Sequence, residues 1–213
     1  MRAILYRRPG LAEDVLELAE LPTPDLAPGE VLVRVSVSGV NPSDVKLRAG
    51  GRPGVEGLPY PAIIPHSDGA GVIEAVGEGV APARIGQSVW LWNAQWQRAN
   101  GSCAEYIALP ENQAVPLPDG IDVETGACLG IPAVTAHACL YADSHPLGET
   151  VLITGGAGAV SAYAIRMASL AGAKVISTIS SQEKADIALE AGAQAVINYR
   201  DEDIAARIMY LTD

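Results

Sequence analysis

The sequence is poor in cysteine and in positive charge, and each shortage excludes a class of protein. Its three cysteines, Cys103, Cys128 and Cys139, are an odd number and form no CxxC pair. This argues against a disulfide framework and against a zinc cluster, and it fits a reducing compartment. Lysine and arginine number 14 against 25 aspartates and glutamates, and the net charge is −11. Nucleic acid and anionic membranes are therefore not expected as partners.

Long apolar runs, internal repeats and low-complexity tracts are also missing. No stretch approaches the length of a membrane span, and residues 1–8 lack the apolar core of a signal peptide. The 213 residues are 49% hydrophobic and 18% charged, which is enough to bury a substantial core in one or two domains. We therefore expect a soluble, cytoplasmic protein with no membrane partner.

The most informative feature that is present is a strand pattern followed by a glycine-rich turn and a helical pattern, over residues 151–160. Gly155, Gly156 and Gly158 separate an apolar strand from a helix that starts near Ala159. Such glycines let the backbone approach a pyrophosphate closely, and the helix N-terminus offers unpaired N–H groups. An ordinary tight turn is the alternative. Ser161 stands where a third glycine usually helps the helix pack, so we expect a slight displacement rather than a lost site.

Strands and helices continue to alternate after this turn. The first helix stops at Gly172. The pattern then predicts strands over residues 174–178 and 195–197 and helices over residues 182–191 and 201–211. This alternation predicts a parallel sheet with crossover helices.

The end of the second predicted strand bears on the choice of cofactor. A site for NAD usually places Asp or Glu there to accept hydrogen bonds from the ribose 2′-hydroxyl. This chain has Ser180 and Ser181 followed by Glu183 and Lys184. The hydroxyls and the lysine suit the 2′-phosphate of NADPH, although Lys184 as an ordinary surface lysine is the alternative. We expect Glu183 to point elsewhere on the first helical turn.

The first half of the chain has a different pattern, with frequent turn residues between short strands. We expect a helix over residues 43–48 and an apolar helix over residues 122–141 that bridges the two halves. The overall pattern is that of an all-β, barrel-like domain. The predicted strands cover residues 2–6, 15–21, 31–38, 70–76, 88–91 and 104–109.

Several ordered motifs resemble the zeta-crystallin type of quinone oxidoreductase, within the medium-chain dehydrogenase/reductases. These are Gly-Val-Asn-Pro-Ser-Asp at 39–44, Gly-Ala-Gly-Val-Ile-Glu-Ala-Val-Gly at 69–77, Gly-Ile-Pro-Ala-Val-Thr-Ala at 130–136, the glycine turn, residues 181–184 and Asn-Tyr-Arg at 198–200. The resemblance implies an α/β fold with a β-barrel. A GroES-like substrate domain over residues 1–122 would precede a Rossmann domain over residues 123–213 that holds the first three strands of its parallel sheet.

The resemblance also implies a function, namely NADPH-dependent reduction of a quinone in a homodimer. Reduction of α,β-unsaturated carbonyls is the near alternative, because the same hydride geometry serves both. Similar proteins continue for roughly a hundred further residues, which complete the Rossmann sheet. The chain is therefore expected to be C-terminally truncated, and a non-catalytic, nucleotide-binding remnant is the alternative from another functional class.

The zinc alcohol dehydrogenases of the same superfamily carry a Cys and a Gly-His-Glu triplet that this chain lacks. Alignment places Asn41 at the cysteine, Ser67 at the histidine and Asp68 at the glutamate, with His66 one residue out of register. These side chains do not supply a tetrahedral zinc site. We therefore expect no metal, and we expect His66 to be a pocket or structural residue. Hydride transfer to a quinone needs little electrophilic help, because it yields a delocalised phenolate.

Candidate site residues follow from these motifs. Asn41, Asp44 and Tyr60 are expected at the substrate, where Asn41 orients the nicotinamide or a carbonyl. For Asp44, capping of the helix over residues 43–48 is an equal alternative. For Trp90, Trp92 and Trp96 a place in the core is favoured, and an aromatic pocket shared with Tyr60 is the alternative. The residues expected to bind the cofactor are Asn41, Lys46, Thr135, Gly155, Gly156, Ala157, Gly158, Ala159, Val160, Ser180, Ser181, Lys184 and Tyr199.

Overall fold

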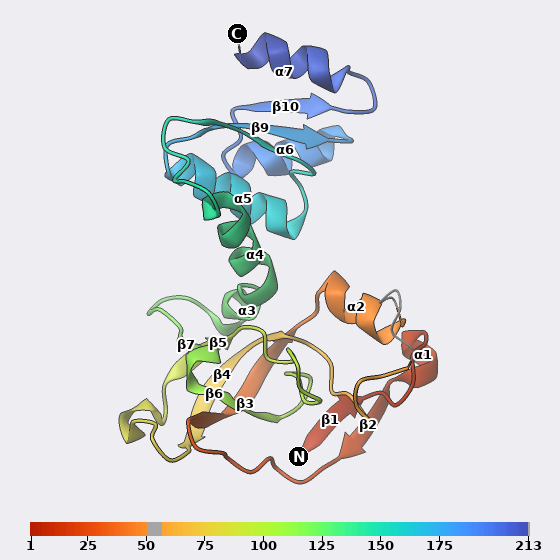
Figure 1. Cartoon of the computed structure of the whole chain (residues 1–213), viewed down its shortest axis with the longest axis vertical. Coiled ribbons are helices and arrows are strands. Elements are labelled where there is room, and N and C mark those ends of the chain that lie inside the picture. Colours follow the sequence, from red (N-terminus) through yellow and green to blue (C-terminus); the bar gives the residue numbers. More distant parts are fainter. Residues whose placement is uncertain (51–56, 213) are drawn as a thin grey trace. The chain divides into compact units, whose positions relative to one another are not determined.

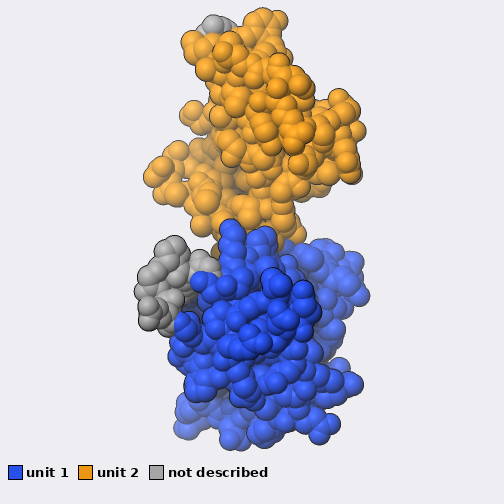
Figure 2. Space-filling view, turned by 90° about the vertical axis from the view of Figure 1, so that its right-hand side faces the viewer, with its two compact units in different colours: residues 1–131 blue, residues 132–213 orange. Residues whose placement is uncertain are grey.

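The computed structural model of the chain describes residues 1–50 and 57–212. These residues fall into two compact units, Met1–Ile131 and Pro132–Asp213, which are coloured separately in Figure 2. Unit 1 carries the strands of the first half of the chain, and unit 2 carries the alternating strands and helices of the second (Figure 1). No helix in the described part of the chain is both long enough and apolar enough to cross a bilayer.

Unit 1 is built on a five-stranded antiparallel sheet with the strand order β6-β3-β4-β5-β7. A two-stranded antiparallel ribbon of β1 and β2 lies beside it, joined by an isolated bridge between Ala3 and Ala104. The strands of the unit are β1 (Arg2–Leu5), β2 (Glu17–Glu20), β3 (Glu30–Gly39), β4 (Asp68–Val76), β5 (Ser88–Leu91), β6 (Tyr106–Pro110) and β7 (Ala114–Pro116).

The core of unit 1 follows from the alternation in the central strand, β3. Val31 and Val33 are fully buried, whereas Arg34 points to solvent and pairs with Glu74 of β4 at 2.6 Å. Gly71 of β4 permits close approach of the strands, because a Cβ there would lie 2.1 Å from the Arg34 carbonyl oxygen. The buried cluster on this sheet comprises Val31, Val33, Ile73, Val80, Val89, Leu91, Ala94, Ile107, Leu109 and Ala114.

The helices of unit 1 are short. The unit has α1 (Ala12–Val15), α2 (Pro42–Arg48), α3 (Val123–Gly126) and two 3-10 turns, η1 (Pro82–Arg84) and η2 (Glu111–Gln113). Helix α3 packs against β4 and β5. Helix α4 (Gly130–Tyr141) begins with the last residues of unit 1 and continues into unit 2.

Four details of unit 1 differ from the sequence-based expectations. Residues 15–21 are not one strand, because Val15 ends α1 before β2 begins. Residues 122–141 are not one helix: Asp122 caps α3, accepting the Thr125 N–H at 2.6 Å, and the chain leaves helical structure before α4. The short strand β7 was not predicted. Within the described residues the main sheet ends at β6 and β7, so it is an open sheet and not a closed barrel.

Unit 2 confirms the predicted alternation of strands and helices. Its parallel sheet has the order β10-β9-β8, which is the order of the first three strands of a dinucleotide-binding fold. Helices α5 and α6 lie on one side of this sheet and α7 lies on the other (Figure 1). Besides α4, the elements of the unit are β8 (Thr150–Ile153), α5 (Ala159–Leu170), β9 (Lys174–Ile179), α6 (Gln182–Glu190), β10 (Ala195–Asn198) and α7 (Ile204–Thr212).

Small side chains let the helices of unit 2 pack closely on the sheet. Ile165 and Ala168 of α5, Val175 of β9 and Ala188 of α6 are fully buried in a single cluster. The three strands have fixed register, with Val151 opposite Val175 and Ile197 opposite Thr178. This packing holds the turn after β8 and the C-terminal end of β9 next to one another.

Candidate functional site

The glycine-rich turn of unit 2 is fixed to β9 by two hydrogen bonds that its backbone N–H groups donate to Thr178. Gly155 has a φ of +68°, which favours glycine, and its N–H donates to the Thr178 hydroxyl at 3.1 Å. The Gly156 N–H donates to the Thr178 carbonyl at 3.0 Å. Gly158 is the N-cap residue of α5 and has no side chain to occupy the N–H groups of the first turn.

Two small residues bring this turn close to its neighbours. A Cβ on Gly156 would lie 2.3 Å from the Ser177 hydroxyl and 2.8 Å from the Ala188 Cβ, so only glycine fits there. Ser161 donates its hydroxyl to the Thr154 carbonyl at 2.8 Å. This bond ties the first turn of α5 to the end of β8, which is the packing function that a third glycine usually serves.

The first turn of α5 presents the remaining predicted residues of the turn. Ala157 is half-buried within the turn, Ala159 is exposed as the first residue of α5, and Val160 is half-buried beside it. Because backbone N–H groups at a helix N-terminus attract anions, this turn has the geometry that a pyrophosphate needs.

The C-terminal end of β9 places Ser180 and Lys184 together. Ser180 is 7% exposed, and the Lys184 ammonium donates to its hydroxyl at 2.9 Å. The Ser181 hydroxyl caps α6 by accepting the Lys184 N–H at 3.4 Å, while Glu183 is exposed. The Tyr199 N–H donates to the Ile179 carbonyl at 3.1 Å, which brings the half-exposed Tyr199 next to the same strand end.

These residues of unit 2 fit NADPH. The turn provides helix N–H groups for the pyrophosphate. Lys184, in the first turn of α6, brings a positive charge to the strand end where NAD sites usually carry a carboxylate. Ser180 and Ser181 add hydroxyl groups. Thr135, another predicted cofactor residue, is exposed on α4.

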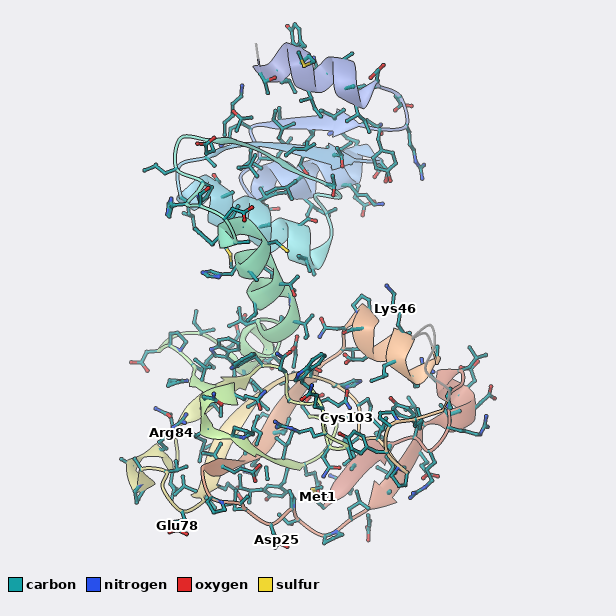
Figure 3. The ribbon with its side chains drawn as sticks, in the orientation of Figure 1. Met1, Asp25, Lys46, Glu78, Arg84 and Cys103 are labelled. Carbon is teal, nitrogen blue, oxygen red and sulfur yellow. The ribbon has the colours of Figure 1, made fainter. Side chains whose placement is uncertain are left out.

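Unit 1 has a cavity of about 560 Å³, and the residues that line it lie between positions 43 and 131, far from the glycine-rich turn in the sequence. Three predicted residues line it: Asp44, Tyr60 and Lys46, the last labelled on α2 in Figure 3. The Tyr60 hydroxyl donates to the Gln97 carbonyl at 2.6 Å. The other lining residues are Ser43, Leu47, Pro59, Ser67, Asn93, Gln95, Trp96, Gln97 and Ile131.

A buried polar network supports one wall of this cavity. The Asp44 carboxylate accepts the Asn41 backbone N–H at 2.7 Å, and the two residues form the capping box of α2. The Asn41 side-chain amide donates to Asp68 at 2.8 Å, and the Asp68 carboxylate also accepts the Ile131 N–H at 2.8 Å. The capping role considered for Asp44 is thus present in the structure. The roles of Asn41 and Asp44 toward a ligand stay predictions.

Burial changes the acidity of both carboxyl groups. Asp44 is 7% exposed and Asp68 is 1% exposed. Desolvation raises the pKa of Asp44 to about 6, and the neighbouring Asp68 charge adds to the increase. Desolvation likewise raises the pKa of Asp68, and it outweighs the hydrogen bonds from Ile131 and Asn41, which lower this pKa. The wall therefore carries a carboxyl group that titrates close to neutral pH.

His66 is linked to Asp68 through two serine hydroxyls. Its Nδ1 is 2.9 Å from the Ser38 hydroxyl, which in turn is 3.0 Å from the Ser102 hydroxyl. Burial lowers the pKa of His66, which favours the neutral imidazole. Its backbone is left-handed, with a φ of 79°.

The residues at the zinc-ligand positions of related dehydrogenases do not fit a zinc ion. The Asn41 amide and the Asp68 carboxylate are hydrogen-bonded to each other, and Asp68 also accepts the Ile131 N–H. Ser67 supplies only a neutral hydroxyl. Within residues 1–50 and 57–212, no three His, Cys, Asp or Glu side chains are grouped so that they could hold a metal ion.

Part of the cavity lining was not predicted, and Trp96 takes the pocket position that was the alternative for the tryptophans. A place in the core was favoured for Trp96, but it is 55% exposed and lines the cavity. Asn93 and Gln97 line it from left-handed backbone, with φ of 49° and 56°, although neither is glycine. Asparagine is enriched in this conformation, so Asn93 carries a weak local signal, whereas Gln97 carries none. The motif containing Gly130 and Ile131 was noticed, but not its contact with Asp68.

The parallel sheet with its glycine turn, together with the antiparallel sheet of unit 1, defines the architecture of the two-domain dinucleotide-dependent oxidoreductases. The model of the "Alcohol dehydrogenase GroES-like domain" family matches residues 27–119. The model of the "Zinc-binding dehydrogenase" family matches residues 159–213. The sequence is 33% identical to a quinone oxidoreductase of Rattus norvegicus over 209 residues, 98% of this chain and 61% of that protein.

Solved structures agree with these matches. An Escherichia coli quinone oxidoreductase complexed with NADPH is 30% identical and has a TM-score of 0.84, over 100% of this chain and 63% of that one. An NAD-dependent alcohol dehydrogenase is 31% identical with a TM-score of 0.88, over 100% of this chain and 67% of that one. The chain belongs to the medium-chain dehydrogenase/reductase family. It spans about three fifths of the length of the quinone oxidoreductases it matches.

Proposed function

We propose that this chain binds NADPH through unit 2 and reduces a quinone held in the cavity of unit 1. The observation that carries the choice of cofactor is the 2.9 Å hydrogen bond between Lys184 and Ser180 at the end of β9. A cation and a hydroxyl at this position attract the 2′-phosphate, which a carboxylate would repel. The quinone oxidoreductase of Escherichia coli that the chain resembles is described as an NADPH complex.

NADPH supplies the hydride when it is bound, and the chain's own residues bind the two ligands and control the proton. The pyrophosphate would lie on the N–H groups of the first turn of α5, next to Gly155 and Gly158. The 2′-phosphate would lie on Ser180 and Lys184. Tyr199 would contact the adenosine end of the cofactor.

Asp44 and Tyr60 line the cavity in unit 1 and are the residues proposed to meet the substrate. Lys46 lines the same cavity and is proposed to contact the cofactor. A reduced quinone needs a proton as well as a hydride. With its pKa raised to about 6, the Asp44 carboxyl holds a proton in part of the molecules near neutral pH. Asn41 holds this carboxyl in place from the helix N-cap. The role proposed for Asn41 is therefore to position Asp44.

We also propose that the protein works without zinc, as a homodimer in the cytoplasm. The absence of a fitting ligand set at Asn41, Ser67 and Asp68 supports the first statement. The homodimer and the cytoplasmic location are proposed from the resemblance to the zeta-crystallin type of quinone oxidoreductase. Sedimentation equilibrium of the purified chain tests the dimer, and a single species of one-chain mass would refute it.

A turnover assay tests the activity. Purified protein is mixed with NADPH and a simple benzoquinone, and the loss of reduced nicotinamide is followed by absorbance, with and without a chelator. We expect quinone-dependent oxidation of NADPH that the chelator leaves unchanged. Oxidation that requires added zinc would contradict the metal-free reading. NADPH binding without any quinone-dependent turnover would contradict the proposed activity while leaving the cofactor assignment intact.

A further inference from the structure

The cavity of unit 1 that Asp44 lines also has Trp96 in its lining, and this tryptophan is more exposed than the other two. Trp96 leaves 55% of its surface exposed, whereas Trp90 and Trp92 are half-buried. A single exposed apolar side chain is ordinary on a protein surface. This one belongs to the wall of a cavity, and it is carried by a firmly anchored segment, residues 92–98.

The first half of this segment is anchored to two other parts of unit 1. The Ala94 N–H donates to the Ser67 carbonyl at 2.9 Å, and Ala94 itself is fully buried. The Gln113 side-chain amide donates to the Asn93 carbonyl at 3.1 Å. The Trp96 N–H donates to the same carbonyl at 3.0 Å, which closes a tight turn. The backbone of Trp96 is therefore fixed, although its side chain is not buried.

The second half of the segment is anchored as well. The Tyr60 hydroxyl donates to the Gln97 carbonyl at 2.6 Å. The buried side chain of Gln95 donates to the Arg98 carbonyl at 2.8 Å. Gln97 has left-handed backbone, with a φ of 56°, which is costly for glutamine. Because such backbone persists only where the surrounding structure imposes it, and clusters at ligand sites, the anchoring of an exposed indole here indicates a binding role.

An indole held in this way suits the face of a flat ring system. Its two fused rings are apolar and rigid, so stacking on them costs little conformational entropy. A ligand with two fused rings covers more of the indole than a single ring does, and the apolar area buried adds to the binding. The cavity volume of about 560 Å³ lies within the range of sites that hold ligands much larger than one ring.

We propose that Trp96 is the specificity-determining residue of this cavity, which stacks on the ring system of the substrate and favours two fused rings over one. The inference rests on the proposed function in taking the ligand to be the substrate. Asp44 and Tyr60 line the same cavity, so a ring stacked on Trp96 is held in the cavity that contains the proposed proton donor. Trp96 is thus expected to control which aromatic substrates the cavity accepts.

Binding without the cofactor is measured by calorimetry with 1-naphthol and phenol. These two compounds are neutral at pH 7 and differ by one fused ring. They are not quinones, so they neither oxidise NADPH nor add to the free cysteines. We expect the parent to bind 1-naphthol at least about tenfold more tightly than phenol. Trp96→Ala should lower this preference about fivefold, and Trp96→Phe should lower it less.

Trp92→Phe is the matched control, because Trp92 belongs to the same segment but does not line this cavity. Its indole N–H donates to the Asn112 carbonyl at 3.0 Å. This variant should bind both compounds as the parent does. Thermal unfolding of Trp96→Ala should match that of the parent, since more than half of the side chain is exposed. Unchanged binding in Trp96→Ala, an equal loss for both compounds, or failure of 1-naphthol to bind the parent would each overturn the proposal.

Turnover separates this inference from the proposed function. With NADPH, the ratio of kcat/KM for 1,4-naphthoquinone to that for 1,4-benzoquinone should fall about fivefold in Trp96→Ala. An unchanged ratio in an active enzyme would overturn the role of Trp96 and leave quinone reduction intact. Absence of turnover with either quinone, together with the expected binding results, would refute quinone reduction and leave Trp96 as the residue that selects the ring system.

Discussion

The two units bury polar side chains in different ways. In unit 2 the buried polar residues belong to one local motif, whereas in unit 1 they are held by contacts between distant parts of the sequence. In unit 2 the buried Ser177, Thr178 and Ser180 are consecutive or nearly so along one strand. They bond to the adjacent strand end, to the glycine turn and to Lys184. In unit 1 the carboxylate of Asp68 is bonded to groups 27 and 63 residues away.

This difference has an energetic consequence. The buried groups in unit 2 are neutral hydroxyls with partners supplied by the same sheet, so they are satisfied as soon as the strands pair. Unit 1 instead buries two carboxyl groups, Asp44 and Asp68, whose charged forms are disfavoured there. Unit 1 is therefore expected to gain stability on mild acidification, through buried carboxyl groups of a kind not found among residues 132–212 of unit 2.

The largest expected effect is on this pH dependence. The pKa of Asp44 is raised to about 6 from its ordinary 3.8, so the folded state binds a proton more tightly than the unfolded state. Above pH 6, keeping Asp44 charged in the folded state lowers the free energy of unfolding by up to about 3 kcal/mol. This loss becomes smaller as the pH falls toward 4. Asp44→Asn, which keeps the acceptor for the Asn41 N–H, should raise the free energy of unfolding by up to this amount at pH 7. At pH 4 the gain should be below about 1 kcal/mol.

Urea denaturation at the two pH values measures this change. Asp25→Asn, at an exposed loop position labelled in Figure 3, is the control and should change stability little at either pH. An Asp44→Asn variant that is equally or less stable than the parent at pH 7 would show that the buried carboxylate is not a cost to unit 1.

The second prediction concerns cofactor binding in unit 2. Lys184→Glu places a like charge beside the 2′-phosphate and removes the bond to Ser180. NADPH affinity should fall about 100-fold, equivalent to about 2.7 kcal/mol, while NADH affinity changes little. Lys174→Glu makes the same charge change at the exposed opposite end of β9 and should affect neither cofactor. Equal loss for both cofactors in Lys184→Glu would mean that Lys184 serves the fold or the pyrophosphate instead.

The third prediction tests how closely the glycine turn packs. A Cβ on Gly156 would meet Ser177 at 2.3 Å and Ala188 at 2.8 Å, whereas one on Gly158 would meet only the Gly155 carbonyl at 3.3 Å and Ser161. Gly156→Ala should destabilise the protein by about 1–3 kcal/mol through overpacking. Gly158→Ala should weaken NADPH binding with a much smaller loss of stability. Thermal unfolding and cofactor titration of both variants separate the two roles, and similar stability of the pair would refute this account of the turn.

The smallest expected effect concerns the hydroxyl that holds the turn. Thr178→Val removes the acceptor of the Gly155 N–H at nearly constant volume. The loss should be about 1 kcal/mol of stability, as for an ordinary hydrogen bond. Thr150→Val, at an exposed position of β8, provides the control. If the two valine variants were equally stable in urea, the bond would contribute nothing measurable to unit 2.

The comparison also explains which features the sequence predicted well. The elements of unit 2 lie within a few residues of their predicted bounds. Hydrophobic periodicity and glycines at the ends of helices are local signals that the sequence shows directly. Ser180 and Lys184 were expected at the same strand end, and they are bonded there because they lie only four positions apart in the sequence. Ser161 was expected to displace the helix slightly, but its hydroxyl gives it a packing role of its own.

Unit 1 was predicted less completely for the same physical reason. The alternation in β3 predicted that strand, but nothing local marks the short β7 or the break before α4. The contact between Asp68 and Ile131 joins segments 63 residues apart. Asn93 and Gln97 both occupy left-handed backbone. Asparagine adopts that conformation more readily than most residues, whereas glutamine gives no such local signal.

The central claim is that the end of β9 selects NADPH. The most direct measurement is a fluorescence titration of the unmodified chain with NADPH and, separately, with NADH under the same ionic conditions. The charge of Lys184 and the hydroxyls of Ser180 and Ser181 predict a dissociation constant for NADPH at least about tenfold lower than that for NADH. Equal constants, or tighter binding of NADH, would contradict the account.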